Sequence, residues 1–383
     1  MSLKVLDLFC GAGGLSKGLE MVGMKIILGV DFDKAAMKTF KKNHPDAEVY
    51  VGDISSLNEK KLVELIHNNE IDVVCGGPPC QGMSTVGEGI PDDPRNFLFK
   101  EFLRIVKMIK PKYIIIENVT GMLSRKNEKI LKAILREFEK IGYSMSVNVL
   151  QASDYGVPQK RRRTIFIGNR LGYENIFPQT THGKNMKEFR TVGDALSNLK
   201  APDGNIYNHN VEDVSIPDGK DKERLKHIPE GRGIRYPDDE KELLPEVLHL
   251  GINWRKVSEG RFRQTKYHRL DRNKPSPTIM TGRYSYYHPT EHRFLTPREA
   301  AAIQSFPNDF VFEGTLSQQF RQIGNAVPPV LAKAIGEAII KMDQIKSKSN
   351  GVKPEIDKIR YHAFNYKSKD LPKSQSELKK FET

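Results

Sequence analysis

KVLDLFCGAGGLSKGLEMVG, residues 4–23, decides the fold class of this chain. Its apolar run KVLDLF is typical of a short buried strand, and GAGG indicates a tight turn. Leu15, Leu19 and Val22 then recur at the spacing of one helix face. The stretch therefore predicts a strand, a turn and a helix in immediate succession.

The same alternation recurs four more times along the chain. Apolar runs that predict strands are each followed by a helical pattern: KIILGVD by KAAMKTFKKN, EVYVGD by NEKKLVELIHNN, IDVVCGG by NFLFKEFLRIVKMI, and YIIIENV by KILKAILREFEKIG. This order predicts an α/β fold with a parallel, doubly wound sheet and helices on both of its faces. Such a sheet binds ligands outside the carboxyl ends of its strands. Those expected ends carry the unusual residues Gly11 to Gly14, Asp31, Asp53, Cys80 and Glu117.

Length and composition narrow the class of protein. A chain of 383 residues with 38% hydrophobic and 28% charged residues indicates a globular protein, which we expect to form two domains. Its three cysteines include no CxxC pair, so neither a disulfide framework nor a zinc site is expected. No uncharged apolar run reaches the roughly 18 residues of a membrane span, and Asp7 comes too early for a signal peptide. We therefore expect a soluble, intracellular protein.

The net charge of +13 and the pI near 9.4 are typical of a protein that binds a polyanion. A generally Lys-rich proteome would produce the same balance.

The glycine turn predicts a cofactor site. Asp31 follows Gly13 by 18 positions (31 − 13), near the roughly 20 expected of a ribose-binding acid. Ser16 replaces the third glycine of a dinucleotide fingerprint, which favours a nucleoside cofactor over a pyrophosphate, and a plain structural turn remains an alternative. Phe32 and Asp53 complete an adenosine pocket if they act together. Taken singly, Phe32 would be a core residue and Asp53 a helix cap.

CGGPPCQGMS, residues 75–84, places Cys80 on a loop stiffened by two prolines. Such a thiol is either an inert apolar residue or a nucleophile that needs activation. Cys10 and Cys75 lie within apolar strands and are expected to be structural.

Two further segments offer partners for that thiol. Glu117 leaves the apolar strand YIIIEN, where burial requires either a function or a salt bridge. In QKRRR, residues 159–163, strand alternation places Arg161 and Arg163 on one face and Arg162 on the other. A solvated basic edge that contacts phosphate is the alternative for these arginines.

Five motifs in this order resemble those of the DNA (cytosine-5)-methyltransferases: DLFCGAGGLS, GGPPCQGMS, ENV, QKRRR and RQIGNAVPP. The resemblance extends from about Val5 to Arg170 and again from Tyr267 to Lys341. It implies S-adenosylmethionine as cofactor and a Rossmann-like methyltransferase fold with one reversed strand. It also implies a smaller, irregular target-recognition domain, and a target cytosine that leaves the duplex.

The resemblance also assigns roles to residues. Cys80 matches the nucleophile that adds to cytosine C6, Glu117 the acid that contacts N3 and the exocyclic amine, and Arg163 the arginine that holds O2. Arg161 is expected to support Arg163 or to contact a phosphate, and no metal is required. The cofactor positions implied are Phe9, Gly11, Gly13, Asp31, Phe32, Asp53, Ile54, Pro79, Leu98, Asn325 and Ala326. Asp31 stands where the family often has Glu, and Phe32 where it often has a larger aromatic residue.

The same comparison suggests a domain plan. Residues 1–180 and 286–345 form the catalytic domain, residues 181–285 the target-recognition domain, and residues 346–383 a basic tail, expected to be flexible or to add nonspecific DNA affinity. Basic and aromatic residues interleave in WRKVSEGRFRQTKYHRL, residues 254–270. The expected DNA contacts are Gln81, Ser84, Arg261, Arg263, Lys266 and Arg283.

The expected protein is thus a monomeric, cytoplasmic enzyme that acts on double-stranded DNA and resembles the modification half of a restriction-modification system. The sequence leaves open whether a cognate restriction endonuclease acts separately as a partner. A tRNA cytosine-5 methyltransferase on the same fold and an inactive DNA-binding regulator are the alternatives, and a nicotinamide oxidoreductase is disfavoured by Ser16 and by the Pro-Pro-Cys segment.

Overall fold

The computed structural model describes residues 2–79, 97–256, 265–345, 359–360 and 363. The chain forms two compact units. The first comprises Met1–Tyr155, Arg161–Thr181 and Ala326–Thr383, and the second comprises Gly156–Lys160 and His182–Asn325. Residues 286–325 thus belong to the second compact unit, although the sequence predicts that they return to the catalytic domain. The predicted boundaries of the functional domains, at residues 180, 285 and 345, remain predictions.

The first unit is built on a seven-stranded sheet of order β3-β2-β1-β4-β5-β7-β6. All neighbouring pairs from β3 to β5 are parallel, and β7 is antiparallel to both β5 and β6. The single reversed strand is therefore β7, which confirms the expected methyltransferase-like sheet. The strands are β1 (Lys4–Leu8), β2 (Lys25–Asp31), β3 (Glu48–Val51), β4 (Val73–Gly76), β5 (Tyr113–Asn118), β6 (Ser144–Gln151) and β7 (Arg162–Asn169).

Helices flank this sheet, as its apolar strands require. Because side chains on both faces of the central strands are buried, Val73 to Gly76 and Tyr113 to Ile116 form uninterrupted apolar runs. The helices of this unit are α1 (Gly14–Glu20), α2 (Lys34–Asn43), α3 (Glu59–Leu65), α4 (Phe97–Ile109), α5 (Glu128–Lys140) and α11 (Pro329–Ile345), with short 3-10 turns η1 (Ile54–Ser56), η3 (Thr120–Leu123), η4 (Arg125–Asn127) and η5 (Ala152–Tyr155) between them.

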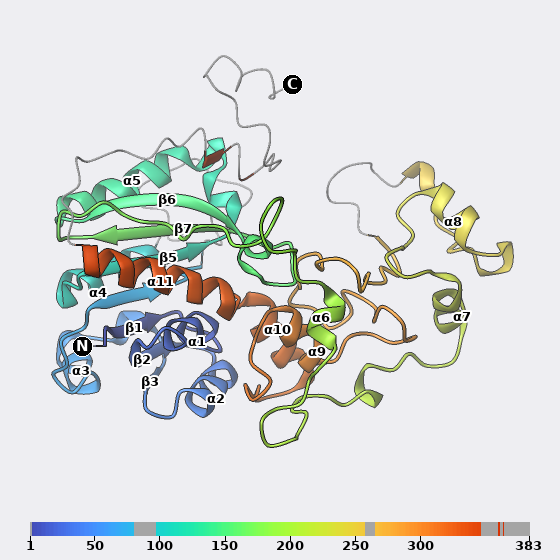
Figure 1. The fold of residues 1–383 in the computed structure, drawn as a ribbon, viewed down its shortest axis with the longest axis horizontal. Helices are drawn as coiled ribbons and strands as arrows, with labels where there is room; N and C mark the ends of the chain where they lie inside the picture. The colour runs from blue at the N-terminus through green and yellow to red at the C-terminus, as the bar shows by residue number, and fades with distance from the viewer. Residues whose placement is uncertain (1, 80–96, 257–264, 346–358, 361–362, 364–383) are drawn as a thin grey trace, which may run out of the picture. The chain divides into compact units, whose positions relative to one another are not determined.

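Two glycines allow α1 and α11 to pack side by side (Figure 1). A Cβ at Gly18 would lie 2.3 Å from the carbonyl oxygen of Pro329, and one at Gly336 would lie 2.8 Å from Val22. Helix α11 is thereby held against the helix that follows the glycine turn, and its Ala332, Ile335 and Ile339 side chains are fully buried.

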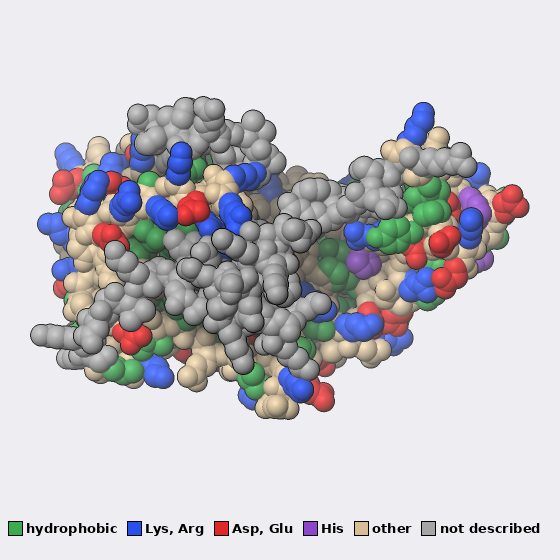
Figure 2. Space-filling model, turned by 90° about the horizontal axis from the view of Figure 1, so that it is seen from above, with side chains coloured by type: hydrophobic (Ala, Val, Ile, Leu, Met, Phe, Trp, Pro, Cys, Tyr) green, Lys and Arg blue, Asp and Glu red, His purple; other side chains and the backbone are tan. Residues whose placement is uncertain are grey.

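Helix α5 is amphipathic. It buries Leu131, Ile134 and Phe138, while Lys and Arg side chains gather on the side of the unit that it covers (Figure 2). Lys132 and Lys140 form ion pairs of 2.6 Å with Glu128 and Glu137 one helical turn away, so part of this charge is neutralised.

Three residues of the basic tail contact this region. Ile359 and Ala363 are buried in the main apolar core. The Arg360 guanidinium donates to the carbonyl oxygen of Leu123 at 2.9 Å and to the carboxylate of Glu128 at 3.0 Å. Ile359, Arg360 and Ala363 therefore anchor the tail to the first unit. The flexibility expected of the tail concerns residues outside the described part.

The second unit is irregular. Its regular elements are short helices joined by turns and isolated bridges. A small core of Ile216, Leu225, Ile228, Ile234 and Leu244 holds part of it together. The elements are α6 (Val192–Leu196), η6 (Glu212–Val214), α7 (Lys220–His227), α8 (Pro237–Leu243), η7 (Glu246–Leu248), η8 (Trp254–Lys256), α9 (Pro297–Ile303) and α10 (Leu316–Asn325).

One stretch of the described chain, Leu316–Ile345, is long and apolar enough to cross a membrane by length and composition. It comprises α10 and α11, and 61% of its most apolar window is buried inside the protein. Buried core helices pass the same test, so this stretch alone assigns no membrane span.

Candidate active site

The turn between β1 and α1 depends on left-handed backbone. Phe9, Gly11 and Gly13 have φ values of 57°, 54° and 91°. A Cβ at Gly13 would lie 2.4 Å from Nε2 of His44, whereas nothing lies within 4 Å of a Cβ at Gly11. Gly13 is therefore required by space as well as by conformation, and the backbone at Gly11 is open to a ligand.

A buried hydrogen bond fastens the strand to the helix beneath this turn. The Ser16 hydroxyl donates to Oδ2 of Asp7 at 2.6 Å, and both side chains are buried. Burial raises the pKa of Asp7 to about 7, against the hydrogen bonds from Ser16 and from the thiol of Cys75. From the sequence, Ser16 is interpreted only as the residue that replaces the third glycine of a dinucleotide fingerprint. The signal that could have revealed the pair is the aspartate inside the apolar run KVLDLF.

Asp31, at the end of β2, supports the same turn. Its Oδ2 accepts a hydrogen bond from the backbone N–H of Gly11 at 2.9 Å, and its Oδ1 accepts one from Asp33 at 2.9 Å. Burial raises the pKa of this carboxyl, and these backbone N–H groups oppose the shift. The neighbouring Phe32 is 72% exposed, so the alternative that it is a core residue is wrong. Its ring is available for stacking on a planar base.

Asp53 and Ile54 follow β3. Oδ1 of Asp53 accepts from the backbone N–H of Ser55 at 2.9 Å, which caps η1 and lowers the pKa of the carboxyl. Ile54 is 4% exposed and belongs to the main core. The helix-cap reading of Asp53 therefore holds in the structure, and contact of its second oxygen with an adenine amine remains a prediction.

The other expected cofactor residues occupy varied positions. Pro79 follows β4 and is half-buried, while Leu98 lies in the first turn of α4 and packs partly against the core. Asn325 ends α10 in the second unit and is exposed, and Ala326 follows it in the first unit.

Glu117 and Arg163 form an ion pair at the carboxyl end of β5. The Nε atom of Arg163 lies 2.7 Å from Oε1 of Glu117, and their side chains are 15% and 12% exposed. Strand register explains the contact, because Glu117 pairs with Ile165 on the antiparallel β7, two residues from Arg163. Burial lowers the pKa of Arg163, and the Glu117 carboxylate opposes that shift. The salt bridge expected as an alternative for Glu117 is therefore present.

Arg161 precedes β7 and is fully buried. Burial is the main cause that lowers the pKa of its guanidinium. The charge of Arg163 adds to this shift, and that of Glu117 opposes it. The alternative of a solvated basic edge is therefore wrong for Arg161. The role expected of Arg161, support of Arg163 or contact with a phosphate, stays a prediction.

The loop after β4 is fastened to the end of β5. Nδ2 of Asn118 donates to the carbonyl oxygen of Pro78 at 3.0 Å. A Cβ at Gly77 would lie 3.1 Å from Oε2 of Glu117, so a larger residue there would crowd the carboxylate. Pro79 is the last described residue before the gap, and Cys80 lies outside the described residues. The segment that leads to Cys80 thus adjoins Glu117.

The expected DNA contacts are only partly described. Gln81, Ser84, Arg261 and Arg263 lie outside the described residues. Lys266 lines a groove of the second unit, and the Arg283 guanidinium lies 4.3 Å from the ring centroid of Tyr284, which lines the same groove. Cys10 and Cys75 are buried, as expected of structural cysteines.

The seven-stranded sheet with reversed β7, and polar groups at the carboxyl ends of β2 and β5, define a Rossmann-like methyltransferase. The family model for "C-5 cytosine-specific DNA methylase" matches residues 3–341. The chain belongs to the C-5 cytosine-specific DNA methylase family, which confirms the resemblance drawn from its motifs.

Relatives of known classification agree. The chain is 39% identical over 350 residues to the Type II methyltransferase M1.HphI of Haemophilus parahaemolyticus, covering 90% of this chain and 88% of the relative. It is 34% identical over 376 residues to the Type II methyltransferase M.DdeI of Desulfomicrobium norvegicum, covering 88% of each. Among solved structures, a prophage-encoded DNA modification methyltransferase of E. coli matches with a TM-score of 0.64 and 30% identity, over 90% of this chain and 100% of that one. The protein is thus a C-5 cytosine-specific DNA methylase, and its relatives include Type II methyltransferases.

Proposed function

We propose that this enzyme transfers a methyl group from S-adenosylmethionine to C5 of a cytosine flipped out of a specific duplex sequence, through a covalent bond between Cys80 and C6. The observation that carries the proposal is the buried ion pair of Glu117 and Arg163. It lies next to Gly77 and Pro78, in the segment that leads to Cys80.

The edge of the sheet near the glycine turn fits the cofactor. Space above Gly11 is open, the Asp31 carboxylate can accept from ribose hydroxyls with its remaining lone pairs, and the exposed Phe32 ring offers a face for adenine. The remaining expected cofactor residues are assigned to the same site by their motifs. When bound, S-adenosylmethionine supplies the activated methyl group.

Cytosine C5 needs activation because the aromatic ring is a poor carbon nucleophile. In the proposed step, the Cys80 thiolate forms a bond to C6, and the electrons released toward C5 form the new bond to the methyl carbon. The methyl–sulfur bond of the donor breaks at the same time, and S-adenosylhomocysteine is the leaving group. C5 then loses its proton and the S–C6 bond breaks, which restores the ring and the thiolate. Glu117 stabilises the protonated N3 and the exocyclic amine during addition, and Arg163 holds O2.

Several broader assignments belong to the same proposal. Residues 181–285 contact the DNA and residues 1–180 and 286–345 carry out the chemistry. The enzyme acts as a monomer in the cytoplasm, where its methylation protects host DNA, and a cognate endonuclease acts separately. The basic charge of +13 supports contact with DNA phosphates.

Methyl transfer from labelled S-adenosylmethionine should be measured on unmethylated genomic DNA and, in parallel, on unmodified tRNA, with digestion to nucleosides and mass spectrometry. We expect 5-methyldeoxycytidine. Label found only as 5-methylcytidine in tRNA would assign the wrong substrate, and absence of label in both would contradict the enzymatic assignment.

Cys80→Ser tests the nucleophile. Turnover should be lost while cofactor affinity stays nearly unchanged, and a duplex carrying 5-fluorocytosine should trap a covalent adduct on the wild-type enzyme because fluorine blocks loss of the C5 proton. Cys75→Ser is the matched control, since Cys75 is buried in β4. An active Cys80→Ser variant, or an adduct mapped to Cys10 or Cys75, would overturn the assignment.

A further inference from the structure

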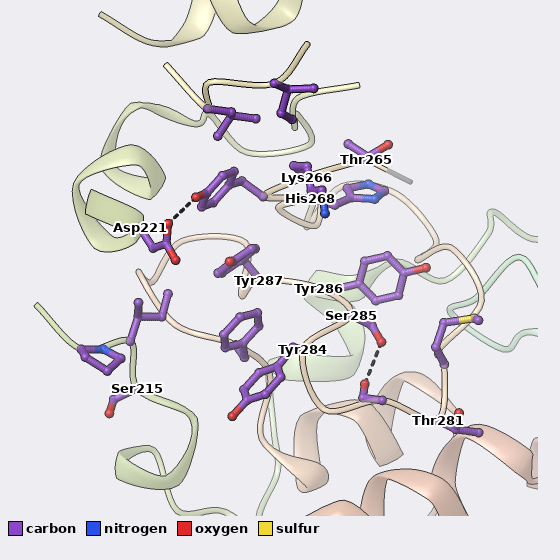
Figure 3. Close-up of a pocket in the computed structure, with 18 residues that line it drawn as sticks. Ser215, Asp221, Thr265, Lys266, His268, Thr281, Tyr284, Ser285, Tyr286 and Tyr287 are labelled. Atoms are coloured by element: carbon purple, nitrogen blue, oxygen red, sulfur yellow. Dashed lines mark hydrogen bonds between the residues drawn. The ribbon is translucent and has the colours of Figure 1, made fainter. Parts of the chain in front are cut away.

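The second unit contains a groove that the assigned chemistry does not use. Its volume is about 1000 Å³, and its walls come from residues 215–217, 221, 250, 252, 265–268, 280–282, 284–287 and 294. We call it the tyrosine groove. Tyr284 and Tyr287 lie on one side of it, and Tyr286 lies on the other (Figure 3).

Aromatic rings stiffen one wall of the tyrosine groove. The ring centroids of Tyr267 and Tyr287 are 5.9 Å apart, and those of Tyr287 and Phe294 are 4.3 Å apart, both in stacked arrangements. Tyr284 continues the row, with its centroid 4.8 Å from that of Phe294. The Tyr267 hydroxyl donates to Asp221 at 2.5 Å, which fixes the other end. The wall is therefore rigid without the help of a ligand.

The charge of the tyrosine groove is close to neutral. Among the described residues that line it, Lys266 is the one permanent cation and Asp221 the one carboxylate. His268 also lines it, and burial lowers the pKa of its imidazole, which favours the uncharged form. A surface that tracks phosphates needs several Lys or Arg side chains. Arg283 stacks on Tyr284 but does not itself line the groove. The lining therefore offers a single permanent cation to DNA phosphates, in a chain of net charge +13, and is better suited to uncharged parts of a ligand.

Several polar side chains of the groove are available for a ligand. The hydroxyls of Thr265, Thr281 and Tyr284 have no hydrogen-bond partner within the described part of the chain. Tyr284 is 58% exposed, and the apolar side chain of Met280, which lines the same groove, is 53% exposed. Hydroxyl groups can donate to or accept from base edges, and apolar side chains contact the thymine methyl group. These are the contacts that distinguish one base pair from another.

A chain of hydrogen bonds fixes the segment that carries Met280, Thr281 and Tyr284. The backbone N–H of Ile279 donates to Oε1 of Gln159 at 2.9 Å, and Nε2 of Gln159 donates to Gln304 at 2.8 Å. Gln304 in turn donates to the carbonyl oxygen of Ile323 at 2.7 Å.

Further contacts fix the same segment on both sides. A Cβ at Gly324 would lie 2.5 Å from the backbone of Met280, so α10 lies directly against the segment. The Tyr286 hydroxyl closes it by donating to the carbonyl oxygen of Thr278 at 3.0 Å. A recognition surface needs this rigidity, because discrimination between bases depends on hydrogen-bond geometry.

We propose that the tyrosine groove contacts the bases of the target sequence rather than its phosphates, and that Met280, Thr281 and Tyr284 determine sequence specificity. This inference rests on the proposed function, in which the second unit contacts DNA. Lys266, the one permanent cation among the described lining residues, contacts a phosphate and positions the duplex without reading its sequence.

The test compares Tyr284→Phe and Thr281→Val with Tyr236→Phe. Tyr236 is an exposed tyrosine of the same unit that does not line the groove. Each full-length variant methylates the same genomic DNA, and bisulfite sequencing reports every methylated site. We expect the first two variants to lose about tenfold or more of their discrimination at one or more positions of the recognition site. Tyr236→Phe should retain the wild-type pattern.

A second measurement separates bases from phosphates. The salt dependence of binding to a cognate duplex should be unchanged in Tyr284→Phe and should fall by about one unit of slope in Lys266→Ala, which should weaken all sequences alike. A wild-type methylation pattern in both Tyr284→Phe and Thr281→Val, or a reduced salt slope in either, would overturn the inference while leaving the proposed function intact. Absence of DNA methylation by the wild-type enzyme would instead overturn the proposed function. Cofactor affinity of each variant verifies folding.

Discussion

Glu117 and Arg163 lie 46 residues apart in sequence (163 − 117), yet their side chains meet at 2.7 Å because β5 and β7 run antiparallel. The reversed strand thus brings a carboxylate and a guanidinium together at the carboxyl end of β5. Neither side chain is well solvated, so removal of one leaves the other charge without compensation.

Glu117→Gln should lower the single-turnover rate of methyl transfer by about 10²- to 10⁴-fold, because the neutral amide cannot stabilise a protonated ring nitrogen in the same way. Affinity for S-adenosylmethionine should be nearly unchanged. Arg162→Ala is the control, since Arg162 alternates with Arg163 along β7. Full activity of Glu117→Gln would remove this residue from the chemistry.

Phe32→Ala should raise the KM for S-adenosylmethionine about tenfold, through loss of a stacking face, with kcat recovered at saturating cofactor. Phe32 is 72% exposed and adds little to the core, so the variant should fold normally. Met21→Ala, an exposed apolar residue at the far end of α1, serves as the matched control. Equal KM values for the two variants would place adenine elsewhere.

Gly13→Ala should destabilise the protein more than Gly23→Ala. Both glycines have positive φ, 91° and 83°, so each substitution carries a backbone cost of about 1 kcal/mol. Only at Gly13 does the new Cβ meet a neighbour, Nε2 of His44 at 2.4 Å, which adds about 1 to 3 kcal/mol. Urea unfolding monitored by circular dichroism measures both. Equal losses would show that His44 moves aside without cost.

Asp7→Asn should change how stability depends on pH. The folded-state pKa of Asp7 is raised to about 7 from 3.8, so between these values the folded state binds more protons than the unfolded state. Its contribution is therefore fully present below pH 3.8 and is lost as the pH rises toward and through 7. Asn keeps a carbonyl oxygen for Ser16 and does not ionise.

The stability of Asp7→Asn relative to wild type should therefore rise from pH 5 to pH 8, by an amount on the order of a few kcal/mol. Thermal unfolding across this range measures the difference. Asp33→Asn is a control, because Asp33 caps α2. A constant difference between wild type and Asp7→Asn over this range would contradict the ionisation of a buried Asp7.

The sequence by itself determined the alternation of strands and helices, the glycine turn, and the motifs around Cys80 and Glu117. These features are local, because strand and helix periodicity and glycine conformation depend on neighbours within a few residues. The ordered motifs further predicted the reversed strand and the family, and both are confirmed.

Only the tertiary structure decided which polar groups meet. Asp31 accepts from Gly11 across 20 residues, and Gln159 reaches Gln304 across 145. The exposure of Phe32 and the full burial of Arg161 also could not be read from their neighbours in sequence. The physical reason is that buried polar groups must find hydrogen-bond partners, and the chain reaches those partners only after strands and helices have packed.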